Sequence, residues 1–120
     1  MLVVEDEPTA LSALRKYFSH AGFAVDYARE IEEAEALVAT SKYDVVIADL
    51  RLTFNYITEG LEILRFVRQH SRDTKFVILT AHGSPEIQRS ARALGAGAFL
   101  QKPMPLPEIA ATVTRLLETA

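Results

Sequence analysis

At 120 residues, the chain has the length of one compact domain with a single hydrophobic core, which leaves no room for a second domain. Hydrophobic residues make up 49% of it and charged residues 24%, and no apolar run approaches the roughly 20 residues that a membrane span needs. The net charge of −3 argues against a nucleic-acid surface and the lack of cysteine excludes disulfide frameworks, so we expect a soluble, cytoplasmic protein without direct nucleic-acid or membrane contacts.

The first part of the chain alternates predicted strands and helices. Residues 2–4 are apolar throughout, which indicates a strand buried on both faces. A helix begins at Pro8 and stops at Gly22, with apolar positions at Leu11, Leu14, Phe18 and Ala21. The stretch 23–28 predicts an edge strand, because it alternates Phe23, Val25 and Tyr27 with smaller or acidic residues. A second helix is marked by Ile31, Ala34, Leu37 and Val38.

The second part repeats this order. Three more apolar runs, at 45–48, 76–79 and 98–100, predict buried strands. Helical spacing lies between and after them, at Leu61, Leu64 and Val67, then at Ile87, Ala91 and Leu94 before Gly95, and finally at Ile109, Val113, Leu116 and Leu117. Strict alternation implies right-handed crossovers over a parallel sheet with helices on both faces, so we predict an α/β fold, a (βα)5 doubly wound three-layer sandwich.

In such a sheet, ligands bind at the carboxyl ends of the strands, and polar residues follow four of the predicted strands. These residues are Glu5 and Asp6, Asp49, Thr80, and Lys102 with Pro103. Taken singly, each is more often a helix cap, a turn residue or a solvated charge. Together, three converging carboxylates repel one another unless a cation neutralises them, and oxygen ligands favour Mg²⁺ or Mn²⁺. The nearby hydroxyl and ammonium groups suit a phosphoryl group.

The motifs that carry these residues resemble those of the receiver domain of two-component response regulators, over the whole length of 1–120. "VVEDE" is similar to the acidic pair of the family, "VVIADL" to its phospho-accepting strand, "VILTA" to its strand-ending hydroxyl, and "GAGAFLQKP" to its switch aromatic and Lys-Pro. The resemblance implies a flavodoxin-like sheet with strand order 2-1-3-4-5. It also implies one receiver domain, either a stand-alone regulator or a domain excised from a longer chain.

The resemblance implies a role for each site residue. Asp49 accepts a phosphoryl group from a sensor histidine kinase or phosphotransfer protein, while Thr80 and Lys102 bind the phosphoryl oxygens. Mg²⁺ is held by Asp6, Asp49 and the backbone carbonyl of Arg51, with Glu5 acting through water. The Lys102–Pro103 bond is expected to be cis. Such a protein catalyses only its own phosphorylation and slow dephosphorylation, so we expect a switch and not an enzyme.

The resemblance further implies that Thr80 and Phe99 form the switch. Their movement would alter the face formed by the fourth helix, fifth strand and fifth helix, which controls an unknown output partner or domain. Arg51 and His82 occupy the positions that tune the lifetime of the phosphorylated state, and their size and charge predict slow hydrolysis. Gly97 and Ala98 stand where dimerising relatives carry acidic residues, so we expect a monomer or weak homodimer.

Two features leave alternatives open. The segment after Asp49, "LRLTFNYITEG", is longer than the family pattern and has no proline; Phe54 and Tyr56 either pack on the third helix or form a lid or partner contact. A phosphorylation-independent interaction module and a small Mg²⁺-dependent phosphotransfer enzyme are the other functions considered. The enzyme is disfavoured because no Asp-x-Asp pair follows the nucleophile. A nucleotide-binding module is disfavoured because "EDEPTA" is acidic where a phosphate loop would lie.

Overall fold

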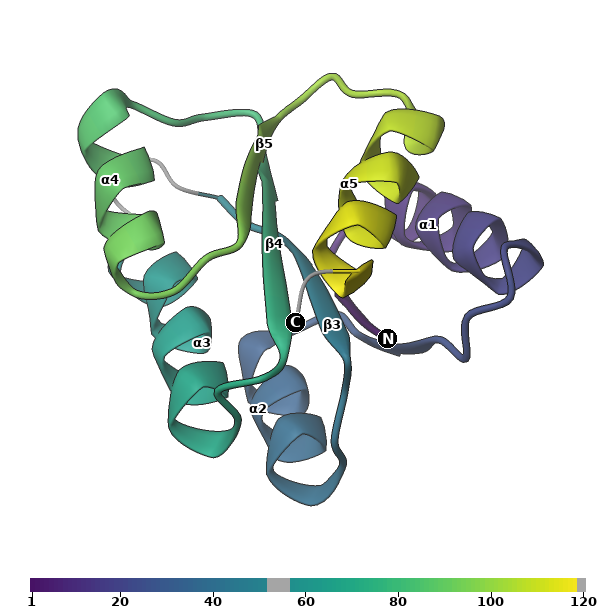
Figure 1. The fold of residues 1–120 in the computed structure, drawn as a ribbon, viewed down its shortest axis with the longest axis horizontal. Coiled ribbons are helices and arrows are strands. Elements are labelled where there is room, and N and C mark those ends of the chain that lie inside the picture. Colours follow the sequence, from purple (N-terminus) through teal and green to yellow (C-terminus); the bar gives the residue numbers. More distant parts are fainter. Residues whose placement is uncertain (52–56, 119–120) are drawn as a thin grey trace.

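The computed structural model describes residues 1–51 and 57–118, and within these ranges strands and helices alternate along the chain (Figure 1). The elements are β1 (Leu2–Val4), α1 (Pro8–His20), β2 (Asp26–Ala28), α2 (Ile31–Thr40), β3 (Val45–Asp49), α3 (Ile57–His70), β4 (Lys75–Thr80), α4 (Pro85–Ala93), β5 (Ala98–Gln101) and α5 (Leu106–Glu118). Of the long segment after Asp49, the last four residues, 57–60, already belong to α3. Residues 52–56, with Phe54 and Tyr56, lie outside the described residues, so their packing or lid role stays a prediction.

The strands form a five-stranded parallel sheet in the order β2-β1-β3-β4-β5. Both the predicted (βα)5 fold class and the strand order are therefore confirmed. The order changes direction between β1 and β3, because β2 lies on one side of β1 while β3 to β5 follow on the other. In parallel sheets with helices on both faces, ligands bind in the crevice at the point where the strand order reverses. A ligand site is therefore expected at the carboxyl ends of β1 and β3.

Two hydrophobic cores lie on opposite faces of the sheet (Figure 1). Helices α2, α3 and α4 cover one face and α1 and α5 cover the other. Because successive strand residues point to opposite faces, Val46 and Ala48 of β3 enter the first core while Val45 and Ile47 enter the second. Burial on both faces explains why the central strands read as continuous apolar runs.

The alternating stretch 23–28 is only partly as predicted. Its strand is at the edge of the sheet, but it is limited to Asp26–Ala28. Ala28 is fully buried, whereas Tyr27 is 43% exposed with the Arg15 guanidinium 3.9 Å from its ring centroid. Phe23 and Val25 pack against the α1 and α5 side before the strand begins. Tyr27 pairs with Val3, whose side chain enters the core on the α1 and α5 side, so Tyr27 shares the face of Phe23 and Val25, as the alternation predicts, but it lies at the exposed rim.

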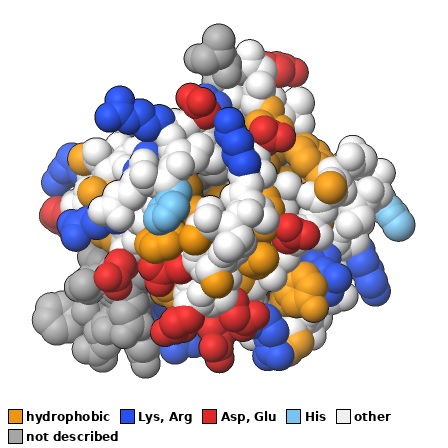
Figure 2. Space-filling model, turned by 90° about the horizontal axis from the view of Figure 1, so that it is seen from below, with side chains coloured by type: hydrophobic (Ala, Val, Ile, Leu, Met, Phe, Trp, Pro, Cys, Tyr) orange, Lys and Arg blue, Asp and Glu red, His pale blue; other side chains and the backbone are white. Residues whose placement is uncertain are grey.

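The outer surface mixes residue types. On the face shown in Figure 2, hydrophobic side chains are interspersed with basic and acidic ones, and the acidic ones gather near the lower edge of the view. Among the helices of the described ranges, none has the length and apolar character needed to cross a membrane.

Candidate functional site

The backbone ladder continues past the ends of the strands and fixes the residues that follow them. Val4 pairs with Ala48 and Asp49 pairs with Leu79, so the ends of β1, β3 and β4 lie next to one another. Beyond the strands, the amide of Leu50 donates to Leu79 O at 2.9 Å. The structure thus brings the predicted strand-end residues to one edge of the sheet.

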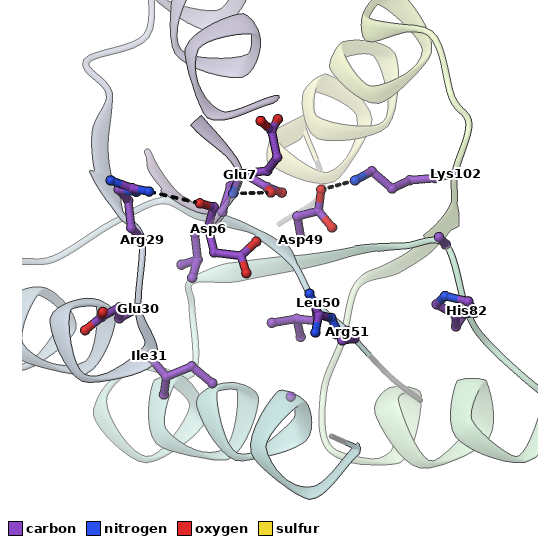
Figure 3. A pocket seen from close by; sticks show the side chains of 14 residues that line it. Asp6, Glu7, Arg29, Glu30, Ile31, Asp49, Leu50, Arg51, His82 and Lys102 are labelled. Carbon is purple, nitrogen blue, oxygen red and sulfur yellow. Dashed lines mark hydrogen bonds and ion pairs between the residues drawn. The ribbon is translucent and has the colours of Figure 1, made fainter. Parts of the chain in front are cut away.

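These ends surround an open pocket of about 440 Å³. Figure 3 shows Asp6 from the β1 end, Asp49 from β3 and Lys102 from the β5 end directed toward a common space. His82 and Arg51 are exposed residues in its wall. All five of these residues were predicted from the sequence as site residues, and all five line this pocket.

Lys102 and Asp49 form an ion pair across the end of β4. The Lys102 ammonium donates a hydrogen bond to Oδ2 of Asp49 (Figure 3), and the side chains are 35% and 10% exposed, respectively. Partial burial lowers the pKa of Lys102, but the hydrogen bond and charge of Asp49, with the charges of Glu5 and Asp6, outweigh burial and raise it overall. The ammonium is therefore held in its charged form beside the carboxylate.

Glu5 is the buried acid of the group, only 3% exposed. Its Oε1 accepts a hydrogen bond from the Glu7 amide at 2.9 Å, whereas its Oε2 is buried without a hydrogen-bond partner in the part of the chain that the structure describes. Burial, and next the neighbouring Asp49 carboxylate, raise the pKa of Glu5 to about 8; the Glu7 amide and Lys102 act in the opposite direction. An unpartnered buried oxygen of this kind is satisfied by a proton, a water or a cation.

The donor set fits a divalent cation that keeps several waters. No three His, Cys, Asp or Glu side chains in the described ranges are arranged to hold a metal by themselves. Asp6 and Asp49 nevertheless offer two carboxylates to one space, and the free oxygen of Glu5 lies in the same pocket. A small hard cation that binds through one or two carboxylates plus waters and backbone oxygens is compatible with this arrangement.

Thr80 lies at the predicted strand end, but its hydroxyl is turned to its own loop. The side chain is fully buried, and Oγ1 donates to His82 O at 2.9 Å and accepts from His82 N at 3.1 Å. Phe99 is partly buried against the core on the α2, α3 and α4 side. The Lys102–Pro103 peptide bond is cis, the form that the resemblance implies.

The pocket lining also includes residues that were not predicted from the sequence, among them Arg29 and Glu7. Arg29 follows β2, and its guanidinium donates to the backbone oxygen of Asp6 at 3.3 Å. Applying the strand-end rule to the edge strand as well would have found it. Glu7 also lines the pocket, but its carboxylate accepts from the Thr9 and Ala10 amides at 3.1 and 2.6 Å. It is therefore the N-cap of α1, and these bonds hold the pKa of the Glu7 carboxyl below its usual value.

Known proteins with this arrangement are response regulators. The family model of the response regulator receiver domain matches residues 1–114. The chain is 34% identical to the transcriptional regulatory protein PmrA of Pectobacterium parmentieri over 117 residues, which are 98% of this chain and 51% of that protein. The chain spans about half the length of the curated relatives it matches; it also covers 50% of the transcriptional regulatory protein CusR of Escherichia coli.

Solved structures agree with this likeness. The non-phosphorylated HemR receiver domain from Leptospira biflexa is 28% identical with a TM-score of 0.87, covering 99% of this chain and 94% of that one. A response regulator from Burkholderia pseudomallei, solved with a phosphorylated aspartic acid, a calcium ion and citrate, is 26% identical with a TM-score of 0.82, covering 93% of this chain and 64% of that one. The chain belongs to the family of response regulator receiver domains.

Proposed function

We propose that this receiver domain is switched by transfer of a phosphoryl group from a phosphohistidine to the carboxylate of Asp49. The observation that carries the proposal is the pairing of Asp49 with Lys102 in a pocket that also holds Glu5 and Asp6. A carboxylate that is oriented by an ammonium and borders an open pocket is a competent nucleophile. Receiver domains are signalling domains rather than enzymes in the ordinary sense.

The transfer balances as a substitution at phosphorus. An oxygen of Asp49 forms the new O–P bond, and the P–N bond of the phosphohistidine breaks, with the imidazole nitrogen keeping the electron pair. The Lys102 ammonium faces the added oxygens and compensates their charge as the group passes. Thr80 contributes a hydroxyl donor to the same oxygens once it leaves the backbone of His82.

Receiver domains bind divalent metal, and we infer that the physiological ion here is Mg²⁺, with Mn²⁺ as a substitute. Asp6, Asp49 and the backbone carbonyl of Arg51 would hold it, and Glu5 would act through a bound water. When bound, the ion would supply positive charge that compensates the phosphoryl oxygens facing Asp49. The buried oxygen of Glu5 without a partner in the described chain supports this assignment.

We further propose the partners and the setting. The phosphodonor is a cytoplasmic sensor histidine kinase or phosphotransfer protein, and residues 1–120 act as one receiver domain that controls an output partner or domain through α4, β5 and α5. PmrA, by its name, regulates transcription, which supports an output of this kind in a longer protein. We expect the isolated receiver domain to be a monomer or weak homodimer.

The lifetime of the phosphorylated state is the finer part of the proposal. Arg51 and His82 lie in the pocket wall next to Asp49, and neither side chain orients a water for attack on phosphorus as well as a carboxylate or amide would. We expect slow hydrolysis that accelerates when Arg51→Asn and His82→Glu are combined. The decay of the phosphorylated protein, followed by intact mass, measures this; decay that is unchanged or slower than in the unaltered chain would contradict it.

Incubation with acetyl phosphate tests the activity itself. With Mg²⁺, the protein should gain the mass of one phosphoryl group, and the modification should be labile at alkaline pH, as an acylphosphate is. Chelation of divalent ions should suppress the reaction. A protein that stays unmodified with both acetyl phosphate and a phosphohistidine donor would instead be a phosphorylation-independent interaction module.

A further inference from the structure

The loop between β4 and α4 connects Thr80 to Phe99 through a glycine. Thr80 is tied to this loop by two hydrogen bonds to the backbone of His82, at 2.9 and 3.1 Å. Gly83 follows directly, and Ser84 then caps α4 with its side chain. The loop is therefore fixed at both ends, with Gly83 between the two attachments.

Gly83 lies directly against the ring of Phe99. A Cβ placed on Gly83 would lie 2.7 Å from Cε1 and 2.8 Å from Cζ of Phe99, well inside the contact distance of carbon atoms. The φ angle of Gly83 is not positive, so the obstacle to a side chain is this contact and not the backbone conformation. Only a residue without a side chain fits at position 83 while the ring stays where it is.

Phe99 and Thr80 share one face of the sheet. Phe99 pairs with Ile78 and Gln101 pairs with Thr80, so Phe99 lies two pairs before Thr80 on the neighbouring strand, and both side chains point to the same face. Ile78 belongs to the core covered by α2, α3 and α4, and Phe99 packs against this core. A movement of Thr80 out of its loop therefore occurs beside the ring that Gly83 touches.

We propose that Gly83 is a positioning residue that couples the hydroxyl of Thr80 to the ring of Phe99. This inference rests on the proposed function, because that function assigns the Thr80 hydroxyl to the phosphoryl group. To reach a phosphoryl oxygen, the hydroxyl must release both backbone groups of His82. The loop then loses its attachment to β4, and Gly83 shifts relative to the Phe99 ring. The arrangement with Thr80 bound to its own loop is thus also the arrangement that needs the contact between Gly83 and Phe99.

An alanine at position 83 should shift the balance between the two arrangements. The added methyl group raises the free energy of the arrangement in which Thr80 bonds to His82, because it collides with the ring. The population of the arrangement with a free Thr80 hydroxyl then increases, even without phosphorylation. Acetyl phosphate should therefore modify Gly83→Ala faster than the unaltered chain.

A double-mutant cycle in the whole chain tests this coupling. Four proteins are compared for their rate of phosphorylation by acetyl phosphate and Mg²⁺: the unaltered chain, Gly83→Ala, Phe99→Ala, and the two substitutions combined. We expect Gly83→Ala to be about threefold faster or more than the unaltered chain, as for residues in direct contact. In the Phe99→Ala background the same substitution should change the rate little, because no ring remains for the methyl group to meet.

The outcomes separate this inference from the proposed function. Suppose that all four proteins are phosphorylated. The coupling does not exist if Gly83→Ala leaves the rate of phosphorylation unchanged or lowers it, or if it raises the rate equally in the Phe99→Ala background. If none is phosphorylated, the proposed function fails, and this inference falls with it. Should Gly83→Ala not fold, NMR contacts between the Gly83 α-protons and the Phe99 ring replace the cycle. They should weaken on full phosphorylation of the unaltered protein; unchanged contacts would overturn the inference.

Discussion

At the scale of single residues, the pocket works by balancing charges. The carboxylates of Glu5 and Asp49 share it with the Lys102 ammonium; Asp49 raises the pKa of both Glu5 and Lys102, and Lys102 acts to lower that of Glu5. The ammonium stabilises negative charge on Asp49, whereas burial disfavours negative charge on Glu5. In the metal-free protein, Glu5 therefore keeps its proton below a pH of about 8. Binding of a divalent ion and ionisation of Glu5 are therefore linked.

The first prediction concerns the pH dependence that Glu5 causes. Its pKa is raised to about 8 in the folded chain from 4.5, so the folded state binds more protons than the unfolded state between these values. In the metal-free protein, the contribution of Glu5 to the free energy of unfolding should therefore be largest below pH 4.5. This contribution is lost as the pH rises through 8. Urea unfolding with a chelator, at a series of pH values, measures it.

The matched control is Glu5→Gln, which keeps the shape and removes the titration. Its free energy of unfolding should fall less than that of the unaltered chain between pH 5 and 8, since Asp49 and Lys102, which face Glu5, remain in both proteins. The increase in the free energy of unfolding that added Mg²⁺ causes should become larger with rising pH in the unaltered chain. In Glu5→Gln it should depend less on pH. Identical pH slopes for the two proteins would contradict the raised pKa.

The second prediction concerns Lys102, whose removal should have opposite effects on metal binding and on phosphorylation. In Lys102→Met, Asp49 loses its ion-pair partner and the pocket loses a repulsive positive charge, so Mg²⁺ should bind more tightly. Phosphorylation by acetyl phosphate should become slower by about tenfold or more, because a donor facing the transferred group is lost. Lys75→Met, at the opposite end of β4, is the control and should change neither. If Lys102→Met raised or lowered both the affinity for Mg²⁺ and the rate of phosphorylation, Lys102 would not have the proposed role of facing the transferred group.

At the scale of elements, Arg68 joins α3 to the turn that leads into β5. Its guanidinium donates to Gly95 O at 2.9 Å through Nη2 and at 3.2 Å through Nε, and to Ser71 O at 3.1 Å through Nη1. Partial burial lowers the pKa of Arg68, although guanidinium groups remain charged in proteins. One side chain thus satisfies carbonyls at the end of α3 and at the end of α4, so it fixes these helices relative to each other.

The third prediction is that Arg68→Ala lowers the free energy of unfolding by about 2 kcal/mol, because it leaves partly buried carbonyls without their charged donor. Arg65→Ala, an exposed position on the same helix, should change it by less than about 0.5 kcal/mol. Urea unfolding of both variants checks this. Phosphorylation of Asp49 should persist in Arg68→Ala, since the residue does not line the pocket. Equal stability of the two variants would mean that this connection contributes nothing.

At the scale of the whole molecule, the alternation of apolar strands and helices was enough to predict the fold and the edge at which the site lies. Strands that are buried on both faces have continuous apolar runs in the sequence, and the carboxyl ends of parallel strands lie at the same edge of the sheet. The proximity of Asp49 and Lys102 could therefore be predicted from the sequence. Properties set by contacts between distant segments could not be predicted. The bonds from Arg68 to Gly95 O, between residues 27 positions apart, are an example, because no periodicity contains that information.

Other features depended on a choice that only the packed structure makes. The hydroxyl of Thr80 can bond to its own loop or to a ligand, and the sequence is the same in both cases. Glu5 and Asp6 are adjacent acids, yet Glu5 is buried with a raised pKa and Asp6 is exposed. Chain order placed both residues at the site but did not divide their roles.

The central claim, that Asp49 is the phosphoryl acceptor, is tested most directly by intact-mass measurement of three proteins after incubation with acetyl phosphate and Mg²⁺. The unaltered chain and Asp44→Asn, an exposed aspartate just before the start of β3, should each gain one phosphoryl group. Asp49→Asn should gain none, because the amide is not a nucleophile of comparable strength. A full phosphoryl adduct on folded Asp49→Asn would contradict the account, since the acceptor would then be another residue.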